Sequence, residues 1–423
     1  MITVQASTRL PPELIIKTIA FLDDRMMSNE EWQHKRSPLS KIRCPISPSL
    51  ISASRVCHTW NDFCRPLIFS RIYIDCEGFM EYADYAALHF EMPHLCKHIR
   101  ELSLNITSAA APPPEWLDDC LSRFTNLKEL ELRNCSEFAQ PGVNPSFVRA
   151  ISASLLPNTS LKCLALIGFR DASDLLLVLS ACSTTLEDLM IHCRQGEYSP
   201  ATTAVVPSVL HMEALRSLEL YLPPAPFTQA DVIECPNLQT LFVFQESPVP
   251  WELPSWIPAS ISELIVQVPL GAPLPRFGQP IRPSSLTIQL DAIDGDITWI
   301  EGCTARLPFL DHLRQLAIKV VVDCDYHVLT FPESSLYEAL CRLLQPLQQR
   351  PTLQAHIILY VFVESHIDLE ADALDILRRR ETARLEEAFA PSLKAGALSV
   401  QLVFRYWGDD DIMRHQTLVL CSV

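Results

Sequence analysis

The stretch Leu127-Lys128-Glu129-Leu130-Glu131-Leu132 decides the fold of this chain. Its apolar side chains alternate with charged ones, which is the period of a strand with one buried face. The same L-x-x-L-x-L pattern, with Ile or Val at some positions, returns along most of the chain. Its copies begin at Ile99, Leu127, Leu161, Leu186, Leu215, Leu238, Ile261 and Leu313, and a degenerate copy lies at Leu286, Ile288 and Leu290.

The spacing of these copies predicts a repeat fold. From Ile99 to Ile261, successive copies start roughly 23 to 34 residues apart, in or near the range of leucine-rich repeats. We therefore predict an α/β fold with an irregular leucine-rich-repeat solenoid. Parallel strands would form its concave face, and helices and Pro-rich turns its convex face. The alternative is an ordinary α/β domain whose strands are rich in leucine.

The segments between and after the repeats have their own signals. Residues 174–179 predict a short helix, and the Pro-rich segments 248–258 and 269–283 predict extended turns. Near the C-terminus the period fails. The predicted elements there are a strand at 353–363 with a fully buried core at 357–363, a long helix at 367–389 and two final strands at 398–406 and 417–421. Because terminal repeats are commonly atypical, we interpret this region as a cap.

Two short amphipathic helices are predicted before the repeats. The first opens at Leu10-Pro11-Pro12-Glu13-Leu14, and its apolar residues Ile15, Ile19 and Leu22 recur at helical spacing. The second opens at Ser49 and places Ala53, Cys57 and Trp60 on one face. Helices this short cannot bury their apolar faces alone, so we expect a partner.

These N-terminal residues resemble an F-box in the form common in mushroom-type fungi. The likeness is carried by Leu10-Pro-Pro-Glu-Leu14, Val56-Cys57-x-x-Trp60 and Pro66-Leu67-Ile68-Phe69, and residues 93–102 look like the segment that joins such an F-box to leucine-rich repeats. The resemblance implies binding to the cullin-adaptor protein of an SCF complex. The residues that it assigns to this contact are Leu10, Pro11, Pro12, Leu14, Ile15, Ile19, Leu50, Val56, Cys57 and Trp60.

One departure from the family is an insert at 25–48, where it usually has only a few residues. The insert is either a loop or an element that alters how the adaptor docks. The predicted organisation is an F-box-like helical domain with this insert (1–75), a helical connector (76–98), irregular repeats (99–350) and a capping region (351–423).

Composition limits the partners and the compartment. Among 423 residues, Lys and Arg number 34 and Asp and Glu 50, so the net charge of −16 argues against binding to nucleic acid or an anionic membrane. The 15 cysteines follow no disulfide framework. Together with the lack of a secretory signal and of a long apolar stretch, they predict a cytoplasmic or nuclear protein with buried thiols.

The chain offers no recognisable catalytic chemistry. Its 10 glycines never have the spacing of a P-loop or a dinucleotide fingerprint. Residues 290–301 mimic the end of an EF-hand loop but lack its first ligands, and Cys44, Cys57, Cys64 and Cys76 form no C-x-x-C pair. We expect no enzyme activity, no cofactor and no metal.

The side chains between the leucines predict a binding face. They include carboxylates and aromatic residues: Glu129, Glu131, Asp188, Glu219, Tyr221, Phe242 and Phe244. Aromatic residues left in water favour a binding role, here for a protein with a basic and partly apolar segment. The alternative is that the Pro-rich loop at 248–258 covers Phe242 and Phe244.

These features together predict a substrate-recognition subunit of an SCF-type (cullin-RING) ubiquitin ligase, with the repeats binding an unknown target protein. The alternative is a leucine-rich-repeat scaffold that is not part of a ligase.

Overall fold

A computed structural model describes residues 14–15, 17–18, 48–75, 93–106, 121–134, 145–155, 160–169, 172–193, 209–221, 233–244, 256–269, 281–292, 312–325, 338, 340–341, 353–364, 379–380, 382–389, 398–407 and 413–421. The chain is of the α/β class, with parallel strands and few helices. It divides into two compact units, residues 1–186 with 199–204 and residues 187–198 with 205–423.

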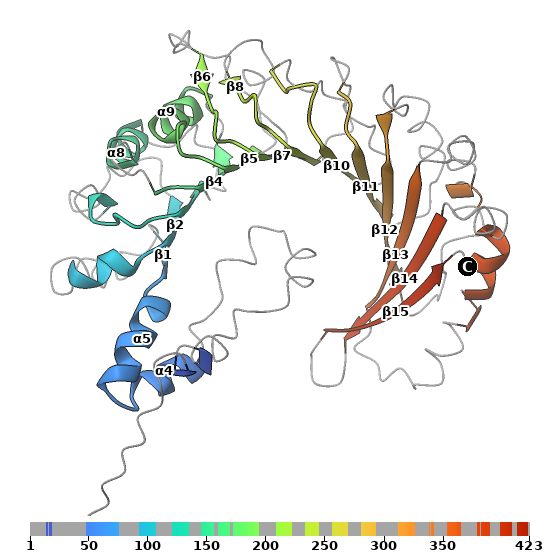
Figure 1. Ribbon diagram of the computed structural model, residues 1–423, viewed down its shortest axis with the longest axis horizontal. Helices are drawn as coiled ribbons and strands as arrows, with labels where there is room; N and C mark the ends of the chain where they lie inside the picture. The colour runs from blue at the N-terminus through green and yellow to red at the C-terminus, as the bar shows by residue number, and fades with distance from the viewer. Residues whose placement is uncertain are drawn as a thin grey trace, which may run out of the picture. The chain divides into compact units, whose positions relative to one another are not determined.

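Residues 14–15 and 17–18 are helical, within the first helix predicted from the sequence. Two helices that lie side by side follow in the first unit, α4 (Pro48–Ser54) and α5 (His58–Ile68) (Figure 1). The sequence predicted one helix through this region, with Cys57 on its apolar face. That prediction is wrong, because Cys57 has extended backbone angles (φ −164°, ψ 172°), precedes α5 and is exposed. Hydrophobic periodicity could not reveal the break, since both helices turn apolar residues toward the same small core.

Directly after α5 comes a strand that the sequence analysis missed, β1 (Arg71–Asp75). It pairs in parallel with β2 (Glu101–Ile106), Ile72 opposite Leu102 and Ile74 opposite Leu104. The sheet therefore starts inside the region predicted as the helical domain. Residues 69–74 read F-x-x-I-x-I, so this strand is a copy of the repeat pattern without leucine.

The remaining elements of the first unit follow the repeat. The 3₁₀ helix η1 (Pro93–His98) lies in the predicted helical connector, and the others are β3 (Glu129–Asn134), α8 (Pro145–Leu155), β4 (Cys163–Phe169) and α9 (Ala172–Cys182). The helix predicted at 174–179 is confirmed as part of α9, which packs against α8 and β4, whereas α8 was not predicted.

The second unit is a longer ladder of the same kind. Its strands are β5 (Asp188–Cys193), β7 (Ser217–Tyr221), β9 (Thr240–Phe244), β10 (Glu263–Pro269), β11 (Ser285–Ala292), β12 (Gln315–Asp325), β13 (Gln354–Glu364), β14 (Leu398–Trp407) and β15 (Met413–Cys421). Neighbours in this order pair in parallel as far as β14, and β15 is antiparallel to β14. The short strands β6 (Leu210–His211) and β8 (Ile233–Glu234) pair separately.

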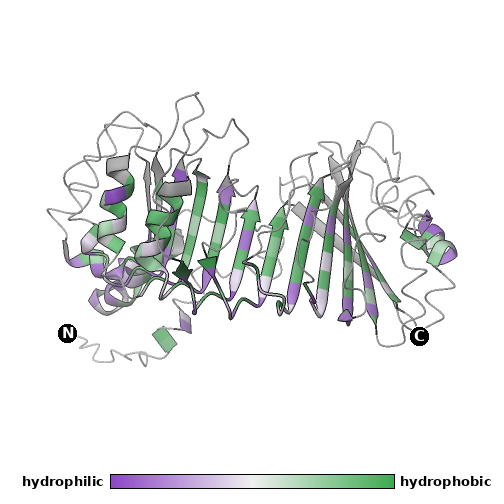
Figure 2. Ribbon diagram, turned by 90° about the horizontal axis from the view of Figure 1, so that it is seen from above, coloured by the Kyte–Doolittle hydropathy of each residue, from purple (hydrophilic) through white to green (hydrophobic). Residues whose placement is uncertain are grey.

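The core of the ladder is made by the leucines of the motif. Leu218, Leu241 and Leu264 are opposite one another on β7, β9 and β10, and all three are fully buried. The next core positions along these strands, Leu220 and Val243, are also fully buried. In Figure 2, apolar and polar bands alternate along the strands. The strand positions predicted from the motif are confirmed, and each strand turns one face into the core.

Past residue 350 the ladder continues without a break in register, since β12, β13 and β14 pair residue by residue. The strand-like run predicted at 353–363 is confirmed as β13, but the prediction that its core at 357–363 is fully buried is wrong at Ile358, which is half-buried between the buried Ile357 and Leu359. Residues 379–380 and 382–389 are helical, as predicted, and bury Leu385 and Phe389. The rest of the predicted helix lies outside the described residues.

Four cysteines are buried as predicted: Cys64, Cys96, Cys182 and Cys235. Burial raises the pKa of Cys182 and Cys235 to about 12, so these thiols are protonated. No helix among the described residues is both long and apolar enough to cross a membrane.

Candidate functional site

The N-terminal helices enclose a very small core. Its buried members are Ile15, Leu50, Ala53 and Cys64. Four larger apolar side chains of α5 pack against this core and are only partly buried: Trp60, Phe63, Leu67 and Ile68. The helices are thus incompletely covered by the described part of the chain.

Three large apolar side chains beside this core are exposed to solvent. Leu14 is 48 % exposed, Ile51 36 % and Val56 65 %. Leu14 and Ile51 are sequence neighbours of the core residues Ile15 and Leu50, so the surface and the core come from the same segments. Large apolar side chains exposed on and beside short helices are typical of a protein interface.

The ten residues assigned to the adaptor contact divide into three groups. Leu14, Val56 and Cys57 are exposed, and Trp60 is half-buried. Ile15 and Leu50 are buried in the small core beneath them. Leu10, Pro11, Pro12 and Ile19 lie outside the described residues, as does most of the insert at 25–48. Ile51 was not assigned, although its place beside Leu50 marks it as an alternative surface position.

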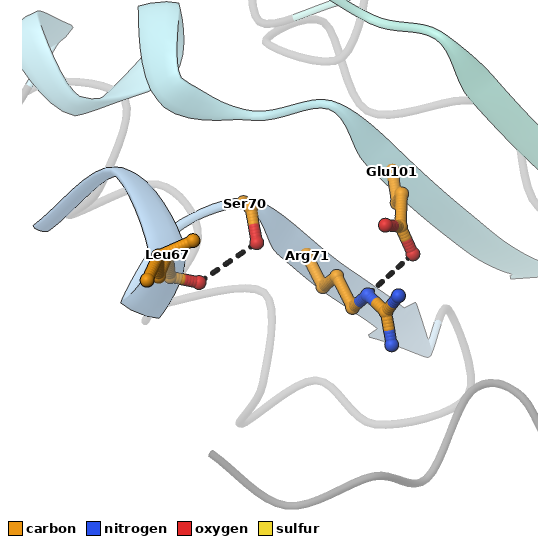
Figure 3. Close-up of polar contacts among 4 residues, drawn as sticks. All are labelled: Leu67, Ser70, Arg71 and Glu101. Carbon is orange, nitrogen blue, oxygen red and sulfur yellow. Dashed lines mark hydrogen bonds and ion pairs between the residues drawn. The ribbon is translucent and has the colours of Figure 1, made fainter. Parts of the chain in front are cut away.

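Two residues, Phe69 and Ser70, separate α5 from β1, and Ser70 makes the hydrogen bonds of this connection (Figure 3). The Ser70 hydroxyl donates to the Leu67 carbonyl at the end of α5 (2.7 Å), and the Ser70 carbonyl accepts from the backbone N–H groups of Arg100 (2.8 Å) and Glu101 (2.9 Å). One residue later, Arg71 on β1 makes a 2.5 Å ion pair with Glu101 on β2. The helices therefore have a short, hydrogen-bonded connection to the first strands and not a flexible linker.

An aromatic cluster lies on the second unit, on the face of the sheet opposite the leucine core. It consists of His192 on β5, Tyr221 on β7 and Phe242 and Phe244 on β9. The Tyr221 ring centroid is 5.1 Å from that of His192, 5.4 Å from that of Phe242 and 5.3 Å from that of Phe244, distances typical of favourable ring contacts. Parallel register creates the cluster, because it sets His192, Tyr221 and Phe244 side by side.

The prediction that Phe242 is an exposed aromatic residue is wrong, since its side chain is only 8 % exposed. It is opposite Glu219 on β7 and Ile265 on β10, and Tyr221 packs against it. Phe244, Tyr221 and His192 remain half-buried and form the accessible part of the cluster. Residues 245–255 are outside the described part of the chain, so covering by the Pro-rich loop is untested.

The predicted carboxylates are split between the two units. Glu219 is half-buried within the face that carries the aromatic cluster, and Asp188 is exposed at the start of β5. Glu129 and Glu131 belong to β3 in the first unit, where Glu129 is exposed and Glu131 forms an ion pair with Arg133. The structure thus brings Glu219 together with the aromatic residues and places Glu129 and Glu131 on a different unit.

No group of three or more His, Cys, Asp or Glu side chains suited to a metal ion occurs among the residues that are described. Cys57 and Cys64 are in this part of the chain, while Cys44 and Cys76 are not.

Neither a scan against protein-family models nor a search of curated proteins finds a match for this chain.

Proposed function

We propose that this chain is the substrate-recognition subunit of an SCF-type ubiquitin ligase and that its parallel strands form an irregular leucine-rich-repeat solenoid. The observation that carries the proposal is the incomplete helical core with its exposed side chains Leu14, Ile51 and Val56. An adaptor helix laid on this surface would bury them, and because they are already partly covered, each would gain only a share of the roughly 1.5–3 kcal/mol for fully burying such a side chain.

The sheet is the proposed target-binding part. In a ladder of parallel strands, the side chains between the leucines form a continuous polar and aromatic surface. The accessible side chains of the aromatic cluster, His192, Tyr221 and Phe244, lie there with Glu219. A partner with an apolar residue beside a basic one matches this combination.

In this role the protein acts through proximity. The adaptor would hold the helices, and the short connection through Ser70 would fix the first strands, β1 and β2, relative to them. Target lysines would then be kept near the ubiquitin-loaded enzyme at a raised effective concentration, with no acid, base or nucleophile from this chain.

The test is co-expression of the full chain with a cullin-adaptor protein, followed by affinity purification and quantification of the bound adaptor. The native chain should copurify with the adaptor. The double variant Leu14→Asp/Val56→Asp should lose at least roughly tenfold in affinity, because two carboxylates would enter an apolar contact.

Leu177→Asp is the matched control. Leu177 is 39 % exposed on α9 in the same unit, so this variant carries the same kind of substitution away from the proposed interface. It should bind the adaptor as the native chain does. If the native chain fails to copurify with the adaptor, the ligase assignment is overturned and the scaffold alternative is favoured.

A further inference from the structure

The first unit contains a pocket of about 360 Å³ that the sequence analysis did not indicate. It lies where α5, η1 and the starts of β2 and β3 meet. Its lining residues are Pro66, Lys97, His98, Arg100, Asn126 and Lys128.

Backbone hydrogen bonds hold the basic residues of this pocket in place. Arg100 and Lys128 occupy the same position in successive repeats, directly before a strand, and the Arg100 carbonyl accepts from the Lys128 N–H at 2.7 Å. The Asn126 side-chain amide donates to the Lys97 carbonyl at 2.7 Å. Two turns and η1 are thus tied together before any ligand arrives, which reduces the entropic cost of binding.

The charge of the pocket is opposite to that of the whole chain. The net charge is −16, yet among the described residues no carboxylate lines the pocket, and none forms an ion pair with Lys97, Arg100 or Lys128. Three cations gathered in one pocket repel one another, and an anion there would remove that cost.

The pKa of His98 agrees with a positive electrostatic potential in the pocket. Burial lowers the pKa of His98, and four basic neighbours lower it further: Lys97, Arg65, His94 and Arg100. All four of these described neighbours are basic.

We propose that this pocket binds a phosphate monoester. A single carboxylate would neutralise only one of the three cations, whereas a phosphate monoester carries a charge of about −1.5 to −2 at pH 7 and three acceptor oxygens. The Pro66 ring, in the last turn of α5, supplies an apolar wall for the organic part of the ester. This site is independent of the proposed ligase function, since it needs neither the adaptor nor the target.

The test is ³¹P NMR of O-phospho-L-serine and of inorganic phosphate titrated with the purified full chain. Binding should broaden the phosphorus resonance of O-phosphoserine. L-Aspartate added at the same concentration as O-phosphoserine should not reverse this broadening. If both phosphates bind equally, recognition rests on the phosphate group. If O-phosphoserine binds more tightly, the wall formed by Pro66 contributes as well.

The decisive variant is Lys97→Ala/Lys128→Ala, which should weaken O-phosphoserine binding roughly tenfold or more. Both side chains are exposed, so the thermal unfolding midpoint should stay close to that of the native chain. The matched control is Arg216→Ala/Arg314→Ala. Arg216 and Arg314 are exposed residues at the equivalent strand-start position in the second unit, and their loss gives the same change in net charge.

The control should bind as the native chain does. Equal weakening in the two double variants, efficient competition by aspartate, or no broadening at all would overturn the proposal, because the first two would indicate non-specific attraction and the third no site.

Discussion

The N-terminal helices and the sheet of the second unit bury apolar side chains to very different extents. The helices enclose four buried residues and leave Leu14, Ile51 and Val56 in contact with water. Each interior strand of the sheet instead places its leucines between those of two neighbours, as Leu241 lies between Leu218 and Leu264. The sheet can therefore sustain itself, whereas the helices depend on what they contact.

This difference would suit the proposed function, in which one chain joins two partners. A region that completes its core on binding gains much of its stability from the partner, while a region with a complete core keeps its surface fixed for another contact. Within the first unit, the hydrogen bonds of Ser70 link the incompletely buried helix α5 to the strands of the sheet.

The largest effect is expected in the sheet. Leu220 on β7 is fully buried between Ile191 and Val243, so Leu220→Ala should lower the free energy of unfolding by about 2–5 kcal/mol. Urea unfolding followed by circular dichroism measures this. The control Leu177→Ala, at a partly exposed position, should cost much less. A small loss for Leu220→Ala would mean that the ladder lacks the continuous core described above.

A smaller, local effect is expected for Leu50→Ala. Leu50 is also fully buried, but it belongs to the small helical core. The substitution should speed amide hydrogen exchange in α4 and α5 and leave β7 protected, because the helices can open without the sheet. Hydrogen-exchange mass spectrometry compares the two regions in one experiment. Equal loss of protection in β7 would show that helices and sheet unfold as one unit.

Much of the fold could be predicted because each copy of the repeat pattern lies within a few consecutive residues. Leu130 and Leu132 alternate with Glu residues, and this pattern is sufficient to place a strand and its buried face. Strand β1 escaped notice because Phe69, Ile72 and Ile74 replace the leucines. The break before α5 escaped because an amphipathic period continues across it.

The sites were less predictable, since they depend on neighbours distant in sequence. Phe242 follows the alternation of an exposed residue but is buried by Glu219, Ile265 and Tyr221 on adjacent strands. The basic pocket joins residues from 66 to 128. A signal was nevertheless present, because Arg100 and Lys128 share the same position in consecutive repeats.

The smallest effect is expected at His98, on the 3₁₀ helix that packs against α5. Burial and neighbouring cations lower its pKa in the folded chain, whereas the unfolded chain keeps a value near 6.5. Between these two values the imidazole is protonated more in the unfolded chain, so the contribution of His98 to the free energy of unfolding rises with pH there and levels off above about pH 6.5. The native chain should therefore lose stability as the pH falls below 6.5.

The variant His98→Gln should lack this part of the pH dependence. Urea midpoints at pH 7.5 and 5.5 provide the comparison, and the native chain should lose more stability than the variant on acidification. The effect is small because His98 is only half-buried and solvent screens its basic neighbours. Saturation with O-phosphoserine should reduce the difference, since a bound phosphate offsets the positive charge around the imidazole. Identical pH dependence in the two chains would show that His98 does not respond to the cations that line the pocket.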